Sequence, residues 1–260
     1  MDSAAGKFLL AIGLCLILGI LELRFPAHER QSLSGRLRNL VLTAITLALG
    51  AAATRLLFYL LPARFDPPPI GRGIRFSIAT ALVYALATDF MFYWYHRAEH
   101  RFPFLWAIHQ LHHSDAELNA TTSMRNYWLE TPLQALVIGI PVGYAIGLDP
   151  LAAALSSFGL MVWFFFAHAN WKLRLGLLTP ILCGPQVHRI HHSTLPQHRD
   201  HNFAQYFPFI DLLFGTYYAP APDDFPPTGT PELASDASLA TVMVRPFRLW
   251  GASLGNLVRG

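Results

Sequence analysis

Residues 74–100 read IRFSIATALVYALATDFMFYWYHRAEH, an apolar segment that runs directly into a pair of histidines. Its apolar part has the roughly 17–25 residues that a helix needs to cross a bilayer. Four other stretches have the same character, although the first is short: residues 8–23, 39–61, 132–148 and 151–169. These segments predict an all-α integral membrane bundle of about four to five membrane helices.

The composition agrees with a lipid environment. Hydrophobic residues make up 53% of the chain and charged residues only 13%, whereas a soluble domain carries about 25% charged residues. No small-x-small cleavage site follows residues 8–23, so we interpret this segment as an uncleaved first helix and not as a signal peptide. The net charge of +3 comes without a nucleic-acid-binding signature, and we expect membrane lipids but no nucleic acid as partners.

Histidines are grouped along the chain, and eleven of the twelve follow residue 95. Three groups have helical spacing: HRAEH at 96–100, HQLHH at 109–113 and HRIHH at 188–192. Residues three and four apart share one face of a helix, so each group points its rings in one direction. Eight imidazoles in three such groups can surround two metal ions, and neutral imidazole suits iron, zinc, copper and nickel.

Topology predicts that the three groups meet. Residues 132–148 and 151–169 form a hairpin around the tight GLDP turn, which returns the chain to the side that it left. His168, at the end of the hairpin, arrives on the same side. In this arrangement 14 of the 19 basic residues lie on the histidine-bearing side, which the positive-inside rule assigns to the cytoplasm. We therefore expect a multi-pass membrane protein whose cytoplasmic helical cap carries a histidine-rich dimetal site.

The histidine groups and their surroundings resemble the fatty acid hydroxylase superfamily, which includes sterol desaturases and C-4 methyl-sterol oxidases. The matching segments are DFMFYWYHRAEH, LWAIHQLHHS, NATTSMR, HAN, VHRIHHS and DHNFAQYFPFIDLLFGTYY. On this basis we divide the chain into N-terminal membrane helices with a loop (1–79), a catalytic domain with three histidine boxes (80–218) and a cytoplasmic or membrane-surface tail (219–260).

The resemblance implies a membrane-bound di-iron oxygenase that hydroxylates or desaturates a lipid C–H bond, in a sterol, a fatty acyl chain or a related lipid. It implies two iron ions as cofactors and O2 as co-substrate. The sequence shows no haem-binding cytochrome segment and no flavin-binding G-x-G-x-x-G. We therefore expect a separate electron-donor protein, which could be a reductase, a ferredoxin or a cytochrome.

The resemblance also assigns site residues. The implied metal ligands are His96, His100, His109, His112, His113, His168, His188, His191 and His192. Asp89, Asn170, Asn202 and Asp211 match positions that would support the ligands by hydrogen bonds to ring nitrogens. His201 is a further candidate ligand. Many family members carry R-x-H-P-x-E after the second box, but this chain reads RNYWLE, so Tyr127 is a candidate variant or substrate-site residue.

Two alternatives belong to other classes of protein. Residues 96–100 also match H-x-x-E-H, the signature of an inverted zinc metalloprotease, in which Glu99 would handle protons. That reading leaves the other two histidine groups without a role. A non-catalytic metal-binding or transport protein would instead distribute histidines and carboxylates along its membrane helices. The sequence leaves open the lipid, the choice between hydroxylation and desaturation, and the oligomeric state.

Overall fold

The fold is described from a computed structural model that covers residues 4–61, 77–147 and 150–259. Within these ranges the secondary structure is helical, with two isolated β-bridges and no strand. The all-α prediction is therefore confirmed. Residues 62–76, which include part of the loop predicted within residues 1–79, lie outside the described residues.

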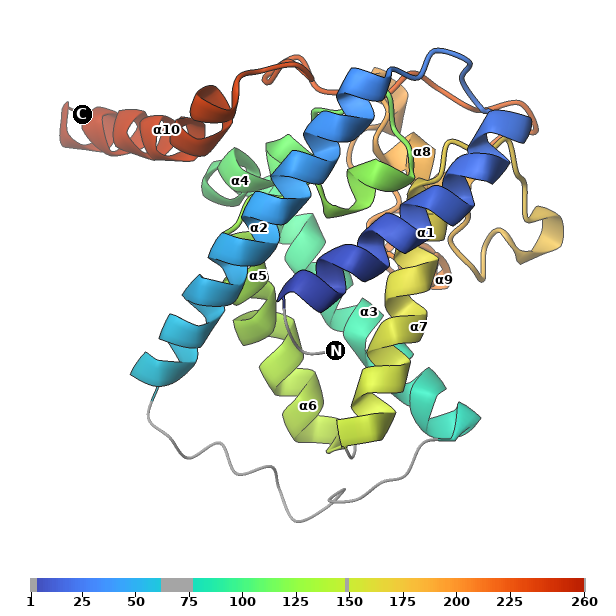
Figure 1. The fold of residues 1–260 in the computed structure, drawn as a ribbon, viewed down its shortest axis with the longest axis horizontal. Helices are drawn as coiled ribbons and strands as arrows, with labels where there is room; N and C mark the ends of the chain where they lie inside the picture. The colour runs from blue at the N-terminus through green and yellow to red at the C-terminus, as the bar shows by residue number, and fades with distance from the viewer. Residues whose placement is uncertain (1–3, 62–76, 148–149, 260) are drawn as a thin grey trace.

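The described residues form five long helices (Figure 1). They are α1 (Ala4–Arg24), α2 (Leu33–Leu60), α3 (Ile78–Arg101), α7 (Pro150–His168) and α10 (Leu239–Arg259). Four of them coincide with predicted apolar segments, and the fifth, α10, does not. Between them lie α4 (Pro103–His113), η1 (Ala120–Met124), α5 (Glu130–Gln134), η2 (Ala135–Gly139), α6 (Ile140–Ile146), η3 (Gly176–Leu178), α8 (Pro185–His191), η4 (Pro196–His198) and α9 (Phe209–Phe214).

Two of the described helices are long and apolar enough to cross a membrane, α2 and, in α7, Leu151–His168. Helix α1 also exposes large apolar side chains, among them Leu16 and Ile20. Water disfavours exposed apolar surface of this extent, whereas a bilayer does not. These features indicate a membrane protein, and the number of membrane helices stays a prediction.

The segment predicted as one helix over 132–148 is divided. Pro141 has no N–H to donate to the preceding turn. Immediately before it, the helix widens into a single π-turn, η2, which separates α5 from α6. Gly147 then ends α6 with a left-handed φ of 61°, a conformation that glycine adopts without a steric penalty. Leu148 and Asp149, the middle of the predicted GLDP turn, lie outside the described residues, and α7 begins at Pro150.

A sharp corner between α3 and α4 positions the functional part of the molecule. Phe102 ends α3 and precedes Pro103, the first residue of α4. Proline disfavours helical geometry in the residue before it, and Phe102 accordingly has φ −104° and ψ 118°. Its N–H donates to Ala98 and its carbonyl accepts from Leu105 and Trp106, so a single residue serves both helix ends. Helix α4 therefore turns back toward the end of α3.

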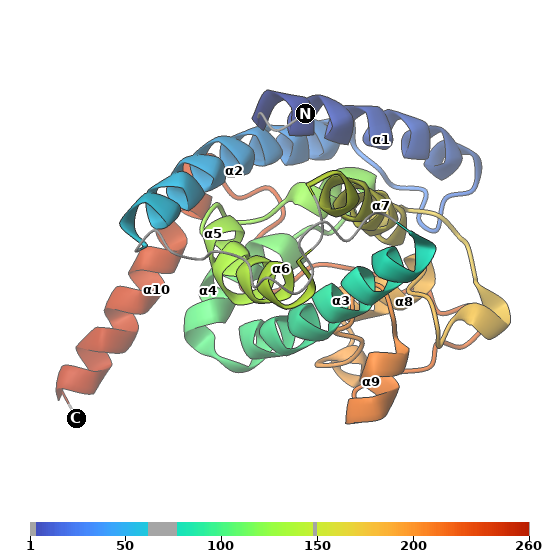
Figure 2. The same ribbon diagram turned by 90° about the horizontal axis from the view of Figure 1, so that it is seen from below.

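The short helices α4 and α8, each of which carries a histidine group, lie at one end of the bundle. In Figure 1, α4 and α8 lie in the upper half, toward which α3 and α7 run, and Figure 2 shows α10 projecting from the rest of the molecule. Helix α10 is fastened to α4, because Trp250 stacks on Phe104 with ring centroids 4.6 Å apart. Val242 is buried in the same core as Ile108. The tail after residue 218 thus ends in a packed helix.

Candidate metal centre

The corner at Phe102 brings two pairs of histidines face to face. His96 and His100 lie one turn apart on α3, and His109 and His113 lie one turn apart on α4. Nε2 of His96 is 3.0 Å from Nε2 of His109, and Nε2 of His100 is 3.2 Å from Nε2 of His113. The four-residue spacing in both sequence groups therefore produces two matched pairs across the corner.

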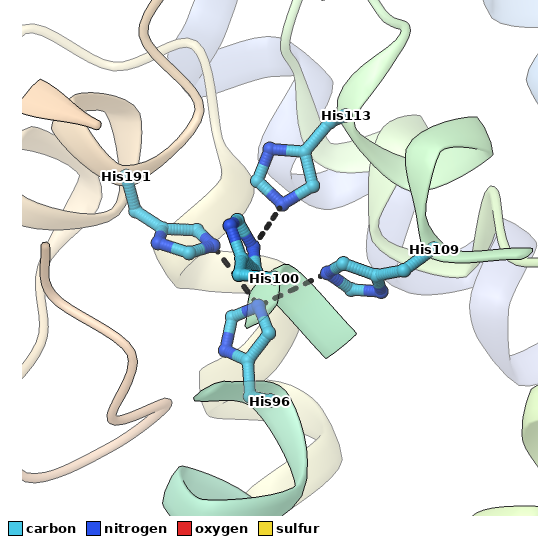
Figure 3. Close-up of side chains that lie close together, drawn as sticks. All are labelled: His96, His100, His109, His113 and His191. Atoms are coloured by element: carbon cyan, nitrogen blue, oxygen red, sulfur yellow. Dashed lines mark hydrogen bonds between the residues drawn. The ribbon is translucent and has the colours of Figure 1, made fainter. Parts of the chain in front are cut away.

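A ring from α8 completes what we term the first cluster, which consists of His96, His100, His109, His113 and His191 (Figure 3). Nε2 of His191 lies 3.0 Å from Nε2 of His96. One ligand atom from each of the five residues lies within 4.8 Å of all the others. Three helices that are far apart in sequence thus direct their rings into one small volume.

The second cluster consists of His112, His168, His188 and His192, whose ligand atoms also lie within 4.8 Å of one another. Nε2 of His168, the last residue of α7, is 3.1 Å from Nε2 of His112 and 2.9 Å from Nε2 of His188. All four side chains are buried. The structure therefore brings all nine predicted ligands together, in two groups.

Each H-x2-H-H box is divided between the clusters. Residues four apart stay together, as in His109 with His113 and His188 with His192. The remaining histidine of each box, His112 or His191, belongs to the other cluster. Adjacent residues point in different directions on a helix, so one box can serve two sites at once.

Backbone carbonyls fix the orientation of key rings. Nδ1 of His96 lies 2.8 Å from the carbonyl oxygen of Phe203, and Nδ1 of His191 lies 2.9 Å from that of His201. A carbonyl only accepts, so in a neutral ring the proton is on Nδ1 and Nε2 carries a lone pair. The Nε2 atoms of His96 and His191 then face each other at 3.0 Å without a proton between them.

This arrangement suits a cation. Burial lowers the pKa of His191 and of the α4 histidines well below the usual value, with neighbouring imidazoles adding to the effect, so the rings are neutral. Facing lone pairs repel unless a positive ion lies between them. Two nitrogens at right angles around a metal ion, each about 2.1 Å from it, are about 3 Å apart. The donor set therefore fits two metal ions that accept imidazole ligands, iron among them.

Two cavities reach the first cluster at His100. One of about 580 Å³ is lined by Trp94, Arg97, Phe102 and Phe203, among others. The other, of about 540 Å³, is lined mainly by residues 193–200 and 229–232. Asp200 borders both, and its carboxylate lies 3.7 Å from Nδ1 of His100. The cluster is thus accessible from this edge.

The two aspartates that were predicted to support the ligands accept hydrogen bonds from backbone N–H groups and not from histidine rings. Asp89 accepts hydrogen bonds of 2.7–3.0 Å from the N–H groups of residues 205–207. Asp211 accepts from the N–H groups of Phe203 and Ala204, at 2.7 and 2.9 Å. Together they fix the loop whose carbonyl orients a ring of the first cluster, so their support is indirect.

The predicted supporting asparagines also bond elsewhere. Oδ1 of Asn170 accepts from Arg189 at 2.8 Å, and its amide donates to the carbonyl of His28 at 2.7 Å. Oδ1 of Asn202 accepts from the N–H of Tyr218 at 2.8 Å. Among the hydrogen bonds of the described residues, none joins these two side chains to a ring nitrogen, so the prediction that they orient the rings directly is wrong.

The remaining two candidates lie apart from the clusters. The ring of His201 donates from Nδ1 to the carbonyl of Arg199 at 2.8 Å, and only its backbone contacts a cluster residue. Tyr127 is buried, and its hydroxyl donates to the carbonyl of Met243 on α10 at 2.7 Å. The departure from R-x-H-P-x-E thus attaches the C-terminal helix and contributes no group to the metal centre.

Two carboxylates that were not among the predicted site residues, Glu99 and Glu130, also lie at the first cluster. Oε2 of Glu99 lies 3.4 Å from Nδ1 of His109, and Oε1 of Glu130 lies 3.6 Å from the same atom. Burial raises the pKa of both carboxyl groups, to about 8 for Glu130. Glu99 faces the side of the His109 ring opposite to Nε2, which does not match the proton-handling role of the zinc-protease alternative. The available signal was position, because Glu99 lies within the first histidine box and Glu130 ends the RNYWLE segment.

Comparison with known proteins supports the resemblance drawn from the sequence. Alkylglycerol monooxygenase of Xenopus tropicalis is 33% identical over 132 residues, and that of Homo sapiens is 32% identical over 134 residues. These matches cover 51% and 52% of this chain but only 29% of each relative. Ornithine lipid hydroxylase OlsE of Rhizobium tropici is 30% identical over 154 residues, which cover 56% of this chain and 43% of the relative.

No solved structure shows significant similarity. The sequence pattern of the fatty acid hydroxylase family matches residues 81–216, which is more than half of the chain. The matched region contains every residue of both histidine clusters. This chain therefore belongs to the fatty acid hydroxylase family.

Proposed function

We propose that this chain is a membrane-bound di-iron oxygenase that hydroxylates or desaturates a C–H bond of a lipid. The observation that carries the proposal is the pair of buried histidine clusters, in which the unprotonated Nε2 atoms of His96 and His191 face each other at 3.0 Å. The names of the relatives, a monooxygenase and a lipid hydroxylase, support the same reaction class.

The histidines would hold the two ions, and burial would confine their contact with bulk water to the edge at His100. Iron in these clusters would supply the reduction of O2 that attack on an aliphatic C–H bond requires and that acid–base side chains cannot provide. Hydroxylation consumes the lipid, O2, two electrons and two protons, and yields the hydroxylated lipid and water. Desaturation consumes the same reactants and yields an alkene and two waters. A separate donor protein would supply the electrons.

The cavity of about 580 Å³ at His100 is the proposed lipid site. Phe102 and Phe203 give it an apolar lining for a hydrocarbon tail. Arg97 and Arg101 lie one turn apart on α3 and also border it, so they would bind a polar head group. The second cavity, with its many polar residues, leaves a separate route to the cluster for small reactants.

The proposed arrangement in the membrane is multi-pass with the clusters on the cytoplasmic side. It rests on α3 and α7, which bring His96, His100 and His168 to the same end of the bundle. Single cysteines introduced beside the clusters and at the opposite end of α2 would test it in sealed vesicles. Equal labelling of both ends by an impermeant reagent would contradict it.

Metal analysis combined with a turnover assay tests the proposed function. Protein purified from iron-replete cells should contain about two iron ions per chain and convert a lipid in the presence of O2 and an electron donor. Lipidomics of a strain that lacks the gene should show the loss of an oxygenated or unsaturated lipid. Turnover that persists without O2 would favour the zinc-protease alternative, and bound metal without turnover would favour a non-catalytic metal-binding protein.

A further inference from the structure

Two buried carboxyl groups lie against the first cluster, that of Glu99 within the first histidine box and that of Glu130 outside the boxes. Glu99, on the last turn of α3, is 0% exposed, and Glu130, the first residue of α5, is 2% exposed. Both face Nδ1 of His109, from 3.4 and 3.6 Å. The ring is thus held between helices that approach from different parts of the chain.

The polar atoms at this contact lack a regular hydrogen bond, and the hydroxyl of Tyr95 is a further group that interacts with Glu99. Both oxygens of Glu99, Oε1 of Glu130 and Nδ1 of His109 are buried and lack a hydrogen bond. A buried polar group without a partner costs about 1–3 kcal/mol of stability, so a native protein retains such a group only for a reason. Nδ1 of His109 is the donor that lies within reach of both carboxyl groups.

The tautomer of His109 follows from its other nitrogen. Nε2 lies 3.0 Å from Nε2 of His96 inside the first cluster, so a metal-binding ring must carry its proton on Nδ1. For His96 and His191 a backbone carbonyl oxygen accepts the hydrogen bond from Nδ1–H, whereas for His109 the acceptors present are carboxyl oxygens. A carboxyl group offers an acceptor oxygen in either protonation state.

The two clusters also differ in their carboxylates. Nδ1 atoms of the first cluster meet Glu99, Glu130 and Asp200 within 4.0 Å, and no ring of the second cluster has such a neighbour among the described residues. Nδ1 of His112 and of His188 is buried without a hydrogen bond. The carboxyl groups therefore act on one of the two sites.

We propose that Glu99 and Glu130 are positioning residues. Their carboxyl oxygens accept a hydrogen bond from the Nδ1–H group of His109, which holds Nε2 of this ring toward the metal ion of the first cluster. This inference rests on the proposed dimetal function. Partners of metal-bound histidines typically contribute about 10–100-fold to metal affinity. The pair would thus set how tightly the first cluster retains its ion.

Substitutions by glutamine and by methionine separate positioning from a purely structural role. Glu99→Gln and Glu130→Gln keep an acceptor oxygen, whereas Glu99→Met and Glu130→Met remove it at similar volume. We expect the double methionine variant to lose one of its two ions to a chelator about 10–100-fold more readily than wild type. The double glutamine variant should restore most of the retention. The thermal midpoint Tm of the metal-free methionine variant should change little, because the removal of two buried carboxyl groups offsets the loss of an acceptor for Nδ1 of His109.

Gln110→Met is the matched control, because Gln110 is also buried on α4 but bonds to Arg245 on α10. It should change stability and leave metal retention as in wild type. Methionine variants that retain both ions as wild type does would overturn the inference. Three ions in wild type, falling to two in the double methionine variant, would also overturn it, since the carboxylates would then be ligands themselves. Wild type that binds fewer than two ions would instead contradict the proposed function.

Discussion

The rings of His113 and His192 stack with centroids 4.3 Å apart and planes inclined by 21°. His113 belongs to the first cluster and His192 to the second, so the two clusters are in direct contact through this pair of rings. The two sites are adjoining halves of one centre.

This division predicts which ion each histidine holds. His112→Ala should remove the ion of the second cluster, and His191→Ala that of the first, so metal content should fall from about two ions per chain to about one in each variant. Turnover should be abolished in both. Metal analysis and a lipid turnover assay check this, with His201→Ala as a control that retains both ions. Full activity in either variant would refute the ligand assignment.

The cavity at His100 predicts a variant that binds metal but not lipid. Ala98 lines this cavity, and Ala98→Trp would fill part of it. Each methylene group kept out of the cavity forfeits about 0.8 kcal/mol, so the exclusion of two raises KM roughly tenfold. The measurement is KM against tail length, with metal content unchanged. Ala252→Trp, on an exposed part of α10, should leave both quantities unaltered. Equal KM values for the two variants would place the lipid elsewhere.

Asp89 holds the backbone of residues 205–207, which predicts an effect on both stability and the metal centre. Asp89→Asn keeps one acceptor oxygen and loses the other together with its charge, at a cost of about 2 kcal/mol in the free energy of unfolding. The loop also carries the carbonyl of Phe203 that orients His96, so metal retention should weaken too. Thermal denaturation and chelator competition in detergent would measure this. A variant that is less stable but retains metal normally would show that the loop does not govern the ring.

Tyr127 stands where many family members have histidine, and its orientation predicts that the difference is structural. Tyr127→Phe loses the hydrogen bond to the carbonyl of Met243 and should destabilise the protein by about 1 kcal/mol. Tyr127→His should add no metal ion, because position 127 faces the core beneath α10. Metal analysis of both variants, beside their Tm values, checks this. A third ion in Tyr127→His would contradict the orientation described.

The spacing of residues along the chain was sufficient to predict the helices and the histidine groups. The features that it did not predict depend on contacts between residues far apart in sequence. The four-residue spacing of His109 and His113 sufficed to place them on one face. The partner of Glu99 is ten residues away across the corner at Phe102, and Glu130 arrives from a third helix, so no helical periodicity could pair them with His109. His201 was a candidate through its proximity in sequence, but its carbonyl and not its ring reaches the site.

The packing of α10 against α4 was not predicted, for a related reason. Its packing depends on Trp250 meeting Phe104, residues that are 146 positions apart. The π-turn before Pro141 could be expected in kind, since proline disrupts a helix, but its form depends on how neighbouring helices accommodate the extra residue. In both cases the structure depends on tertiary neighbours that the periodicity of the segment itself does not reveal.

The division of each histidine box has a consequence for the distance between the two clusters. His112 and His113 are joined by one peptide bond, as are His191 and His192, and each dipeptide has one ring in each cluster. Consecutive Cα atoms are held about 3.8 Å apart by covalent geometry. Two dipeptides therefore link the clusters through the backbone, and each limits how far the rings of one cluster can move from those of the other.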